Sequence, residues 1–535
     1  MTALAPASPA TRIDRDASKP KWSAAASRGI HTRVVIEGTL RLLSPAHFGN
    51  GDAEDMTDLP LLRDAVDDRP LLTGASLAGA LCEYLVRRLG EAKGFATAKA
   101  LFGSADDNGT QSALIIDDAL GQTPGVEVRD GVALDPCTRT ADDGALFNIE
   151  TWQIGTAFPL RLELLLSDDE GENKNGNKID LRAALATALE GFADGSITLG
   201  ARKRRGYGQV KVDEWRVCTF DLSQPAHLLG WLASELSLDE RKRHGLDALR
   251  GPQSQALAQS LPGPAPDARS LVELKARFSI DGSVLIRATT GRDDLGPDMM
   301  HLHLSNDGRR TPVISGTSMA GALRARATRI AHVLKVNAKL IEDVFGSDRV
   351  RGDSDALTAS KLTVFDSVIE QANADLIQSR VKIDRLTGGA FDGALFSEQP
   401  AFGGTVELRL RLADASSRGV GLLLMLLKDL WTGDLPIGGE IGAGRGRLQG
   451  HSATLTWARP SQPGVWQFTQ SNGGALRIIG DAAELERCVE ALSSPGTTNT
   501  EPAPAKVLAS SQRAEDASPD ASPDASPDAS PEARP

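Results

Sequence analysis

The stretch GASLAGAL at residues 74–81 returns almost unchanged as GTSMAGAL at residues 316–323. Three more matches follow in the same order: FGS at 102–104 and 345–347, DGALF at 143–147 and 392–396, and GYG at 206–208 against GRG at 444–446. Ordered self-similarity of this kind is the signature of repeated structural units. The chain is therefore predicted to contain two copies of one unit.

Each copy shows the same succession of strand and helix patterns. In the first copy, apolar residues alternate along 33–43 and 156–166, as in half-buried strands, whereas 74–89 and 181–192 have helical spacing. A last strand is expected at 209–220, and a hairpin-like insertion interrupts the pattern. This βαββαβ order predicts an α+β protein with two tandem ferredoxin-like, RRM-like domains that carry hairpin insertions.

The boundaries of the parts follow from these patterns and from local composition. The expected parts, in chain order, are an N-terminal arm (1–32), the first module (33–218), a linker with short helices (219–272), the second module (273–457), a C-terminal extension (458–495) and a tail (496–535). The tail repeats Ala-Ser-Pro-Asp and has almost no bulky apolar side chains. It cannot bury enough apolar surface to fold, so we predict that it is disordered.

Composition narrows the class of protein. The chain has 535 residues, of which 41% are hydrophobic and 24% charged, which is material for more than one globular domain. No run approaches the roughly 18 consecutive apolar residues of a membrane span, and the N-terminus lacks a secretory pattern. We therefore expect a cytoplasmic protein with no membrane partner. The four cysteines lie far apart with no C-x-x-C pair, which argues against disulfides and structural zinc.

Charge is distributed unevenly along the chain. The net charge of −12 would ordinarily argue against a nucleic-acid binder, because phosphate contacts need positive charge. However, part of the acidity lies in the tail, and basic residues cluster in the glycine-rich stretch GARKRRGYG at 200–208. Its glycines let backbone N–H groups approach an anion, and its four cations can neutralise phosphates. A solvated basic loop is the alternative. The candidate residues for binding a polyanion are Arg202, Lys203, Arg204, Arg205, Gly206 and Gly208, with Gly444, Arg445 and Gly446 in the less charged second copy.

The starts of the two repeated helices are a second candidate for phosphate binding. The small residues Gly74 and Ser76, and likewise Gly316 and Ser318, leave a helix N-terminus uncovered, where free N–H groups favour an anion. Ordinary helix capping is the alternative. In the second copy the phosphate-binding interpretation is strengthened by two cations on the next turn, Arg324 and Arg326.

An acidic loop precedes the first repeated helix. Residues 47–58 begin with His47, end with Asp58 and hold three Asp and one Glu. Carboxylates so placed could hold Mg²⁺ or orient a 2′-hydroxyl for attack on its own phosphate. The alternative is a solvated acidic loop.

Together these motifs resemble the RAMP superfamily, and within it the repeated backbone subunit of type III CRISPR effector complexes. The resemblance covers both modules and rests on HFGNGD at 47–52, DLPLLRD at 58–64 and PLLTGAS at 70–76, in this order and spacing. The layout, with two modules fused in one chain, resembles type III-D systems most.

The resemblance implies a function and places its residues. It implies that Asp58 cleaves a single-stranded target RNA with a divalent metal, Mg or Mn, and that His47 binds RNA nearby. It also implies that the glycine-rich loops and helix starts hold a guide CRISPR RNA, and that thumb hairpins at 135–155 and 384–404 wedge between nucleotides. Other type III effector subunits would be the protein partners.

The second copy departs from this pattern at the acidic position. Counting back from Gly316 by the spacing between Asp58 and Gly74 leads to Met300, and Asp298 lies two residues away. Asp298 is therefore the candidate for a second catalytic residue. Two other functions stay open: a guide-binding backbone without catalysis, and metal-independent processing of guide precursors by histidine, for which His301 and His303 form the only close pair.

Overall fold

The computed structural model describes residues 29–51, 59–104, 109–135, 140–167, 179–234, 255–288, 296–306, 308–347, 357–460, 462–470 and 474–493. These residues belong to one compact unit that spans 1–493. Residues 52–58 of the acidic loop, which include Asp58, and the tail expected at 496–535 lie outside the described residues.

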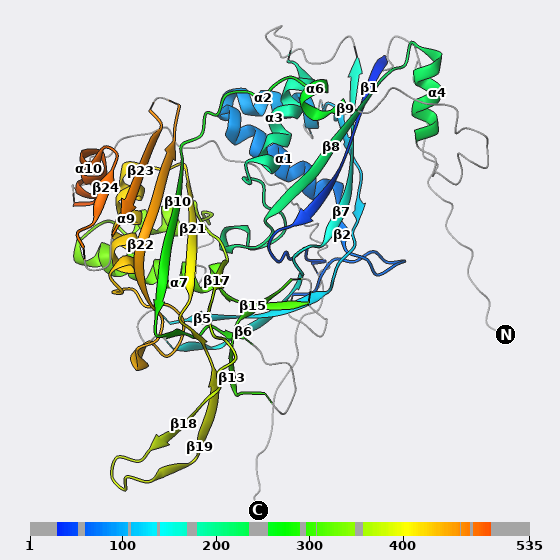
Figure 1. The fold of residues 1–535 in the computed structure, drawn as a ribbon. Coiled ribbons are helices and arrows are strands. Elements are labelled where there is room, and N and C mark those ends of the chain that lie inside the picture. The colour runs from blue at the N-terminus through cyan, green and yellow to red at the C-terminus, as the bar shows by residue number, and fades with distance from the viewer. Residues whose placement is uncertain are drawn as a thin grey trace, which may run out of the picture. The chain divides into compact units, whose positions relative to one another are not determined.

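The first sheet is built around β1 (Ile30–Leu42), which pairs antiparallel with β7 (Ala157–Ser167) and β8 (Val210–Asp221). The sheet order is β3-β7-β1-β8-β9. The edge strands are β3 (Leu114–Ile116) and β9 (Gln255–Ala256). Figure 1 shows α1, α2 and α3 together on one side of this sheet, and their bounds are Gly74–Leu89, Glu91–Phe102 and Leu181–Ala193.

The second sheet repeats this plan around β10 (Leu271–Asp281), which pairs antiparallel with β21 (Thr405–Ala413) and β22 (Arg447–Ala458). The remaining strands along this sheet are β14 (His303–Asn306), β15 (Arg309–Ile314), β16 (Leu362–Val364), β17 (Ser367–Glu370), β23 (Gly464–Thr469) and β24 (Arg477–Ile479). Its helices are α7 (Gly316–Val333), α8 (Lys339–Phe345), α9 (Ser417–Trp431) and α10 (Ala482–Ser493).

The alternation of apolar residues explains why these strands cover a core. Along β10 the side chains of Val272, Leu274, Ala276 and Phe278 are buried, because successive residues of a strand point to opposite faces. Helix α9 packs against this face, and α10 packs closely against α9. A Cβ on Gly421 of α9 would lie 2.1 Å from the Cys488 carbonyl oxygen of α10.

A long hairpin interrupts each module between its helical first half and its third main strand. In the first module it consists of β5 (Val126–Leu134) and β6 (Ala141–Trp152), and in the second of β18 (Gln378–Ile383) and β19 (Ala390–Gln399). The two registers match residue for residue, because Leu134 pairs with Ala141 as Ile383 pairs with Ala390. The β18–β19 hairpin extends away from the second sheet (Figure 1).

Short elements complete the described chain. The short strands are β2 (Leu71–Leu72), β4 (Ala119–Leu120), β11 (Ser283–Val284), β12 (Arg287–Ala288), β13 (Met299–His301) and β20 (Ala401–Phe402). The short helices are α4 (Pro225–Ser234), α6 (Leu257–Ser260) and the 3-10 turns η2 (Lys203–Arg205) and η4 (Ile441–Ala443). No described helix is both long enough and apolar enough to cross a membrane.

The predicted α+β class is confirmed, since helices and antiparallel sheets are combined in both modules. The strands that match the first, second, third and fourth of the predicted pattern are β1, β3, β7 and β8. They lie in the spatial order second, third, first, fourth, and β10, β16, β21 and β22 do the same. This order is compatible with a ferredoxin-like fold.

Candidate functional site

The glycine-rich turn of each module is held by the same backbone contacts. In the first module the Ala201 N–H donates to the His47 carbonyl oxygen at 2.9 Å, and in the second the Gly439 N–H donates to the Leu285 carbonyl oxygen at 2.8 Å. His47 and Leu285 therefore occupy equivalent positions. Because the backbone makes this contact, it does not depend on the side chain at either position.

Glycine is required at the end of each turn by close approach and by φ. A Cβ on Gly208 would lie 1.8 Å from the Leu199 carbonyl oxygen, and a Cβ on Gly446 would lie 1.9 Å from that of Ile437. Both glycines have positive φ, as do Gly206 and Gly444. The repeated glycines thus build the turn, and the charge of the turn is a separate property of the first copy.

The four consecutive cations of the first turn face two different ways. Burial, followed by the proximity of Arg324 and Arg202, lowers the pKa of Arg205, so these three cations form one cluster. Arg202 also lies over the Phe147 ring of the β5–β6 hairpin, at 4.4 Å. Lys203 and Arg204 belong to a second cluster, since burial and then Arg87 lower the pKa of Arg204. Four consecutive cations in a sequence do not indicate this division, because it depends on the 3-10 geometry of η2.

The helix starts are capped by carboxylates of the same chain. Asp118 Oδ1 accepts from the Gly74 N–H, and Asp366 Oδ1 accepts from the Gly316 N–H, each at 2.7 Å. The N–H groups of Ser76 and Ser318 are likewise taken, by Thr73 Oγ1 and Ser315 Oγ, each at 3.3 Å. An anion at these helix starts would meet a carboxylate, which favours the capping interpretation.

The start of α7 also lies against the first module. A Cβ on Gly316 would lie 2.5 Å from the Arg205 carbonyl oxygen, and a Cβ on Gly206 would lie 2.8 Å from the Asp366 nitrogen. These two glycines, predicted as RNA contacts, therefore permit the close approach of the two modules.

A buried ion pair joins the modules at the same place. Arg129, on the first hairpin, donates to Asp366 of the second module at 2.9 Å and to Glu127 at 2.9 Å. The side chains of Arg129 and Asp366 are 2% and 5% exposed, and the guanidinium lies 5.3 Å from the ring centre of Tyr207. Sequence reasoning missed Arg129, Tyr207 and Asp366. For Asp366 the sequence does carry a signal, because a short apolar strand is followed by Asp in both copies, at 114–117 and at 362–366.

Two of the predicted RNA-binding cations form ion pairs with carboxylates of the same chain. Arg326 donates to the buried Asp429 at 2.6 Å, and Arg445 pairs with the fully buried Glu398 and with Gln378. The Arg445 side chain is only 3% exposed. Neither belongs to the proposed guide interface, because each guanidinium is already paired with a buried carboxylate that neutralises its charge.

The side chain of His47 distinguishes the first module from the second. It is buried, and its Nδ1 lies 2.8 Å from the Glu150 carbonyl oxygen. Burial lowers the pKa of His47, so the ring is neutral at pH 7. Glu150 also bonds the chain just after the acidic loop, through its N–H to Leu59 and its carboxylate to the Leu61 N–H. His47 and Glu150 therefore border the point at which residues 52–58 rejoin the described chain.

The second acidic candidate, Asp298, is described, and the sheet register relates it to Asp58. Leu59, the residue after Asp58, forms a parallel bridge with Ile149, and Met299, the residue after Asp298, pairs in parallel with Glu398. Ile149 and Glu398 are equivalent hairpin positions, since they face Arg129 and Gln378 in matched registers.

This register aligns Asp298, rather than Met300, with Asp58. Counting along the sequence pointed to Met300 because Asp58 lies 16 residues before Gly74, whereas Asp298 lies 18 residues before Gly316. Asp298 Oδ2 accepts from the N–H of Ser397, at 2.7 Å, and from its hydroxyl, at 2.9 Å. These bonds lower the pKa of Asp298, which is ionised at neutral pH.

No metal cluster is formed by the residues that the structure describes: nowhere in them do three His, Cys, Asp or Glu side chains gather as ligands. Asp58, the predicted ligand, and its acidic neighbours lie outside those residues. His301 and His303 do not resemble a catalytic pair. His301 is fully buried and accepts from the Ile286 N–H at 3.1 Å, and burial lowers the pKa of His301 to about 4.

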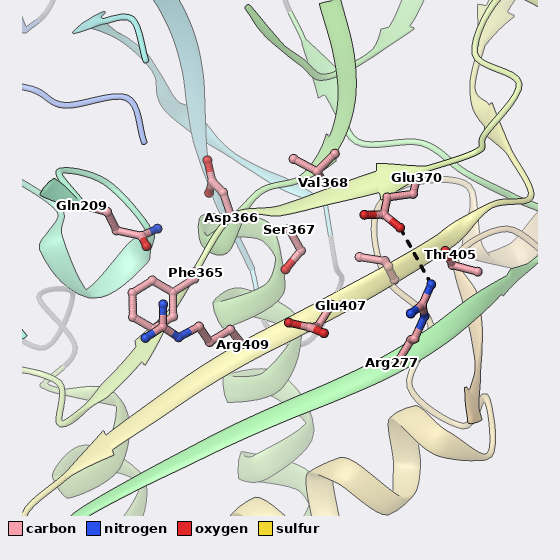
Figure 2. A pocket seen from close by; sticks show the side chains of 11 residues that line it. Gln209, Arg277, Phe365, Asp366, Ser367, Val368, Glu370, Thr405, Glu407 and Arg409 are labelled. Atoms are coloured by element: carbon pink, nitrogen blue, oxygen red, sulfur yellow. Dashed lines mark ion pairs between the residues drawn. The ribbon is translucent and has the colours of Figure 1, made fainter. Parts of the chain in front are cut away.

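A polar cavity of about 340 Å³ lies on the face of the second sheet that points away from the core (Figure 2). Arg277 pairs with Glu370 across it at 3.8 Å, and Arg409 lies over the Phe365 ring at 4.7 Å. Gln209 brings the first module to its edge. Because Arg409 is also bonded to Glu273, the cations of this cavity are already paired, and we assign it no ligand.

Comparison with known families agrees with the duplicated architecture. The model of the RAMP superfamily matches residues 39–211 and 291–449, which together exceed half of the chain and fall one in each module. The chain therefore belongs to the RAMP superfamily. Membership implies involvement in a type III CRISPR complex. No curated protein matches the chain.

Proposed function

We propose that this chain is a backbone subunit of a type III CRISPR effector complex, laid out as in type III-D systems with two fused ferredoxin-like modules. In this proposal it works in the cytoplasm with other effector subunits, holds a guide RNA and cleaves the paired target RNA. The cleavage sites are Asp58 and Asp298, each with Mg or Mn. The observation that supports two sites is that Leu59 and Met299, the residues after the two aspartates, pair in parallel with equivalent positions of the two hairpins.

The proposed guide interface combines charge and exposed hairpins. Arg202, Arg205 and Arg324 gather where the two modules meet, and such a cluster can neutralise a phosphate backbone. The hairpins carry exposed leucines at equivalent positions, Leu146 at 70% and Leu395 at 73% exposure. Exposed apolar side chains on a projecting hairpin suit insertion between bases, because bases offer apolar faces.

The chemistry proposed for the two aspartates is the same. A divalent cation, when bound, would polarise the scissile phosphate and lower the pKa of the attacking hydroxyl. The carboxylates would hold it, since hard cations prefer carboxylate oxygens. Asp298 is suited to this because it is ionised at neutral pH and both hydrogen bonds from Ser397 to its side chain go to Oδ2.

The test is to map the ends of the products. The effector complex would be reconstituted with guide RNA, Mg²⁺ and end-labelled target RNA, using Asp58→Ala, Asp298→Ala and the double variant. We expect two cuts, of which each single variant loses one, by about a hundredfold or more in rate, while guide binding is retained. Asp375→Ala, which removes an exposed carboxylate that is not part of either proposed site, is the control.

The outcomes separate three possibilities. Unchanged cleavage in the double variant would overturn the assignment of both sites. Loss of all cleavage in Asp58→Ala alone would assign catalysis to the first module only. Intact RNA binding without any cut in the wild type would favour a guide-binding backbone that is not catalytic.

A further inference from the structure

A small cavity of about 80 Å³ lies where the first module meets the start of β10 and the end of β21. Helix α1 and the turn η2 line it from the first module. It lies on the side of η2 toward which Lys203 and Arg204 point, whereas Arg202 and Arg205 belong to the other cluster. The cavity is therefore distinct from the guide interface proposed above.

Its lining is strongly positive. Glu83 and Asp414 are the carboxylates among the lining residues, and they face five cations: Arg87, Lys203, Arg204, Arg269 and Arg411. Arg269 is satisfied by Asp194 and Asp267, each at 2.8 Å. Arg87 and Lys203 share the single carboxylate of Glu83, at 3.1 and 3.5 Å. Among the lining residues themselves, positive charge is therefore in excess.

The excess is greatest at Arg204. Arg204 donates to the neutral Thr363 hydroxyl at 3.2 Å, and no carboxylate of the described chain lies within ion-pair distance of it. Burial, then repulsion from Arg87, lowers the pKa of Arg204. Arg411 shares the Glu273 carboxylate with Arg409, at 3.5 Å and 2.7 Å. It also donates to the Gly195 carbonyl oxygen at 2.7 Å and to the Asp194 carbonyl oxygen, and its buried Nε has no partner.

We propose that this cavity is a phosphate-binding site formed jointly by the two modules. Half-buried guanidinium groups that repel one another are stabilised by an anion, and planar guanidinium donors match the oxygens of phosphate. The volume has room for roughly two to three waters at about 30 Å³ each, which fits one phosphate group and no nucleobase. The ligand is therefore inorganic phosphate or the phosphate of a larger molecule, bound by that group alone.

The bound anion would also tie the modules together, because Arg87 and Arg204 come from the first module and Arg411 from the second. Binding at this junction should stabilise the folded chain by mass action. The inference does not rest on target cleavage or on guide binding, and inorganic phosphate tests it without RNA.

The experiment compares sodium phosphate with sodium chloride at equal ionic strength, using the full chain. Thermal unfolding and calorimetry would be measured for the wild type, Arg204→Gln and Arg87→Gln. Phosphate should raise the Tm of the wild type above its value in chloride, and each variant should bind phosphate roughly tenfold more weakly. Arg216→Gln, which removes an exposed cation from β8, should bind as the wild type does. Arg87 is 41% exposed, so its variant keeps the test valid if Arg204→Gln fails to fold.

Equal Tm in phosphate and chloride, or an equal loss of binding in Arg216→Gln, would overturn the proposal. A guide-length RNA, added in competition, identifies the source of the phosphate. Displacement of phosphate by RNA would assign the cavity to a backbone phosphate, and independent binding would assign it to a free phosphate compound.

Discussion

The two modules share one backbone plan but differ in charge at the same turn. In the first, η2 is preceded by Arg202 and consists of cations, whereas in the second, η4 is preceded by Glu440 and consists of Ile441, Gly442 and Ala443. Arg202 and Glu440 have nearly the same φ, 56° and 58°. The fold therefore fixes the conformation of the turn through its glycines and backbone bonds, and leaves its side chains free to diverge.

The two turns also differ in the residues that they contact. The first turn lies against the second module, with Gly206 beside Asp366 and the Arg205 carbonyl beside Gly316. In the second turn, Arg445 replaces Tyr207 and is buried with Glu398 of its own hairpin. The turn of the first module thus forms part of the contact between the modules. The turn of the second module instead buries its Arg445 within its own module. The following changes test how far this contrast goes.

The largest effect on stability is expected at Arg129. Arg129→Met should lower the free energy of unfolding by about 3–5 kcal/mol, because it leaves the Asp366 carboxylate buried without its partner. Urea unfolding measures this change. The equivalent position in the second module gives the matched control, because Gln378→Met removes only one hydrogen bond from Arg445 and should cost about 1 kcal/mol. Equal costs would show that the buried pair is not what distinguishes the two copies.

An intermediate effect is expected on RNA binding. Arg202→Gln combined with Arg205→Gln should weaken binding roughly tenfold for all sequences and reduce the slope of log K against log salt by about 1.4, since each phosphate contact on a single strand acts through counterion release. Filter binding at several salt concentrations measures both quantities. The control removes the same charge from β8, with Lys211→Gln and Arg216→Gln. A slope that falls equally in both double variants would mean that the turn is not a local RNA contact.

The smallest effect on stability is expected at His47. Because Leu285 makes the same backbone contact in the second module, His47→Leu should change the free energy of unfolding at pH 7.5 by less than about 1 kcal/mol. If His47 has a role in RNA binding or cleavage, this variant should lose that activity while it keeps its fold. A loss of several kcal/mol would contradict the equivalence of the two positions.

His47 also gives a pH dependence with a defined sign. Burial lowers the pKa of His47 from 6.5, so between the lowered value and 6.5 the unfolded chain binds more protons than the folded chain. The stability contributed by the neutral ring is present above about pH 6.5 and is lost as pH falls toward the folded pKa. His47→Leu should remove this part of the curve. The part caused by His301, whose pKa is lowered to about 4, should remain.

Part of the site could be predicted from the sequence, and part could not. The glycines of the two turns could be recognised because positions with close approach and positive φ require glycine, and glycine is visible in the sequence. The partners of Arg326 and Arg445 were not, since Asp429 lies 103 residues from Arg326 and Glu398 lies 47 from Arg445. The alignment of Asp298 was displaced by two residues, because the count along the chain ran across a connection that is longer in the second copy.

The sequence by itself determined that two α+β modules follow one another, because self-similarity and the periods of strands and helices are properties of neighbouring residues. Tertiary structure alone decided which charges are presented. The turn η2 separates Arg202 and Arg205 from Lys203 and Arg204, and the packing of the second module gives Arg204 a neutral partner and Arg129 a buried carboxylate. The physical reason is that burial and pairing set the effect of a charge, and both depend on residues that meet only when the modules pack.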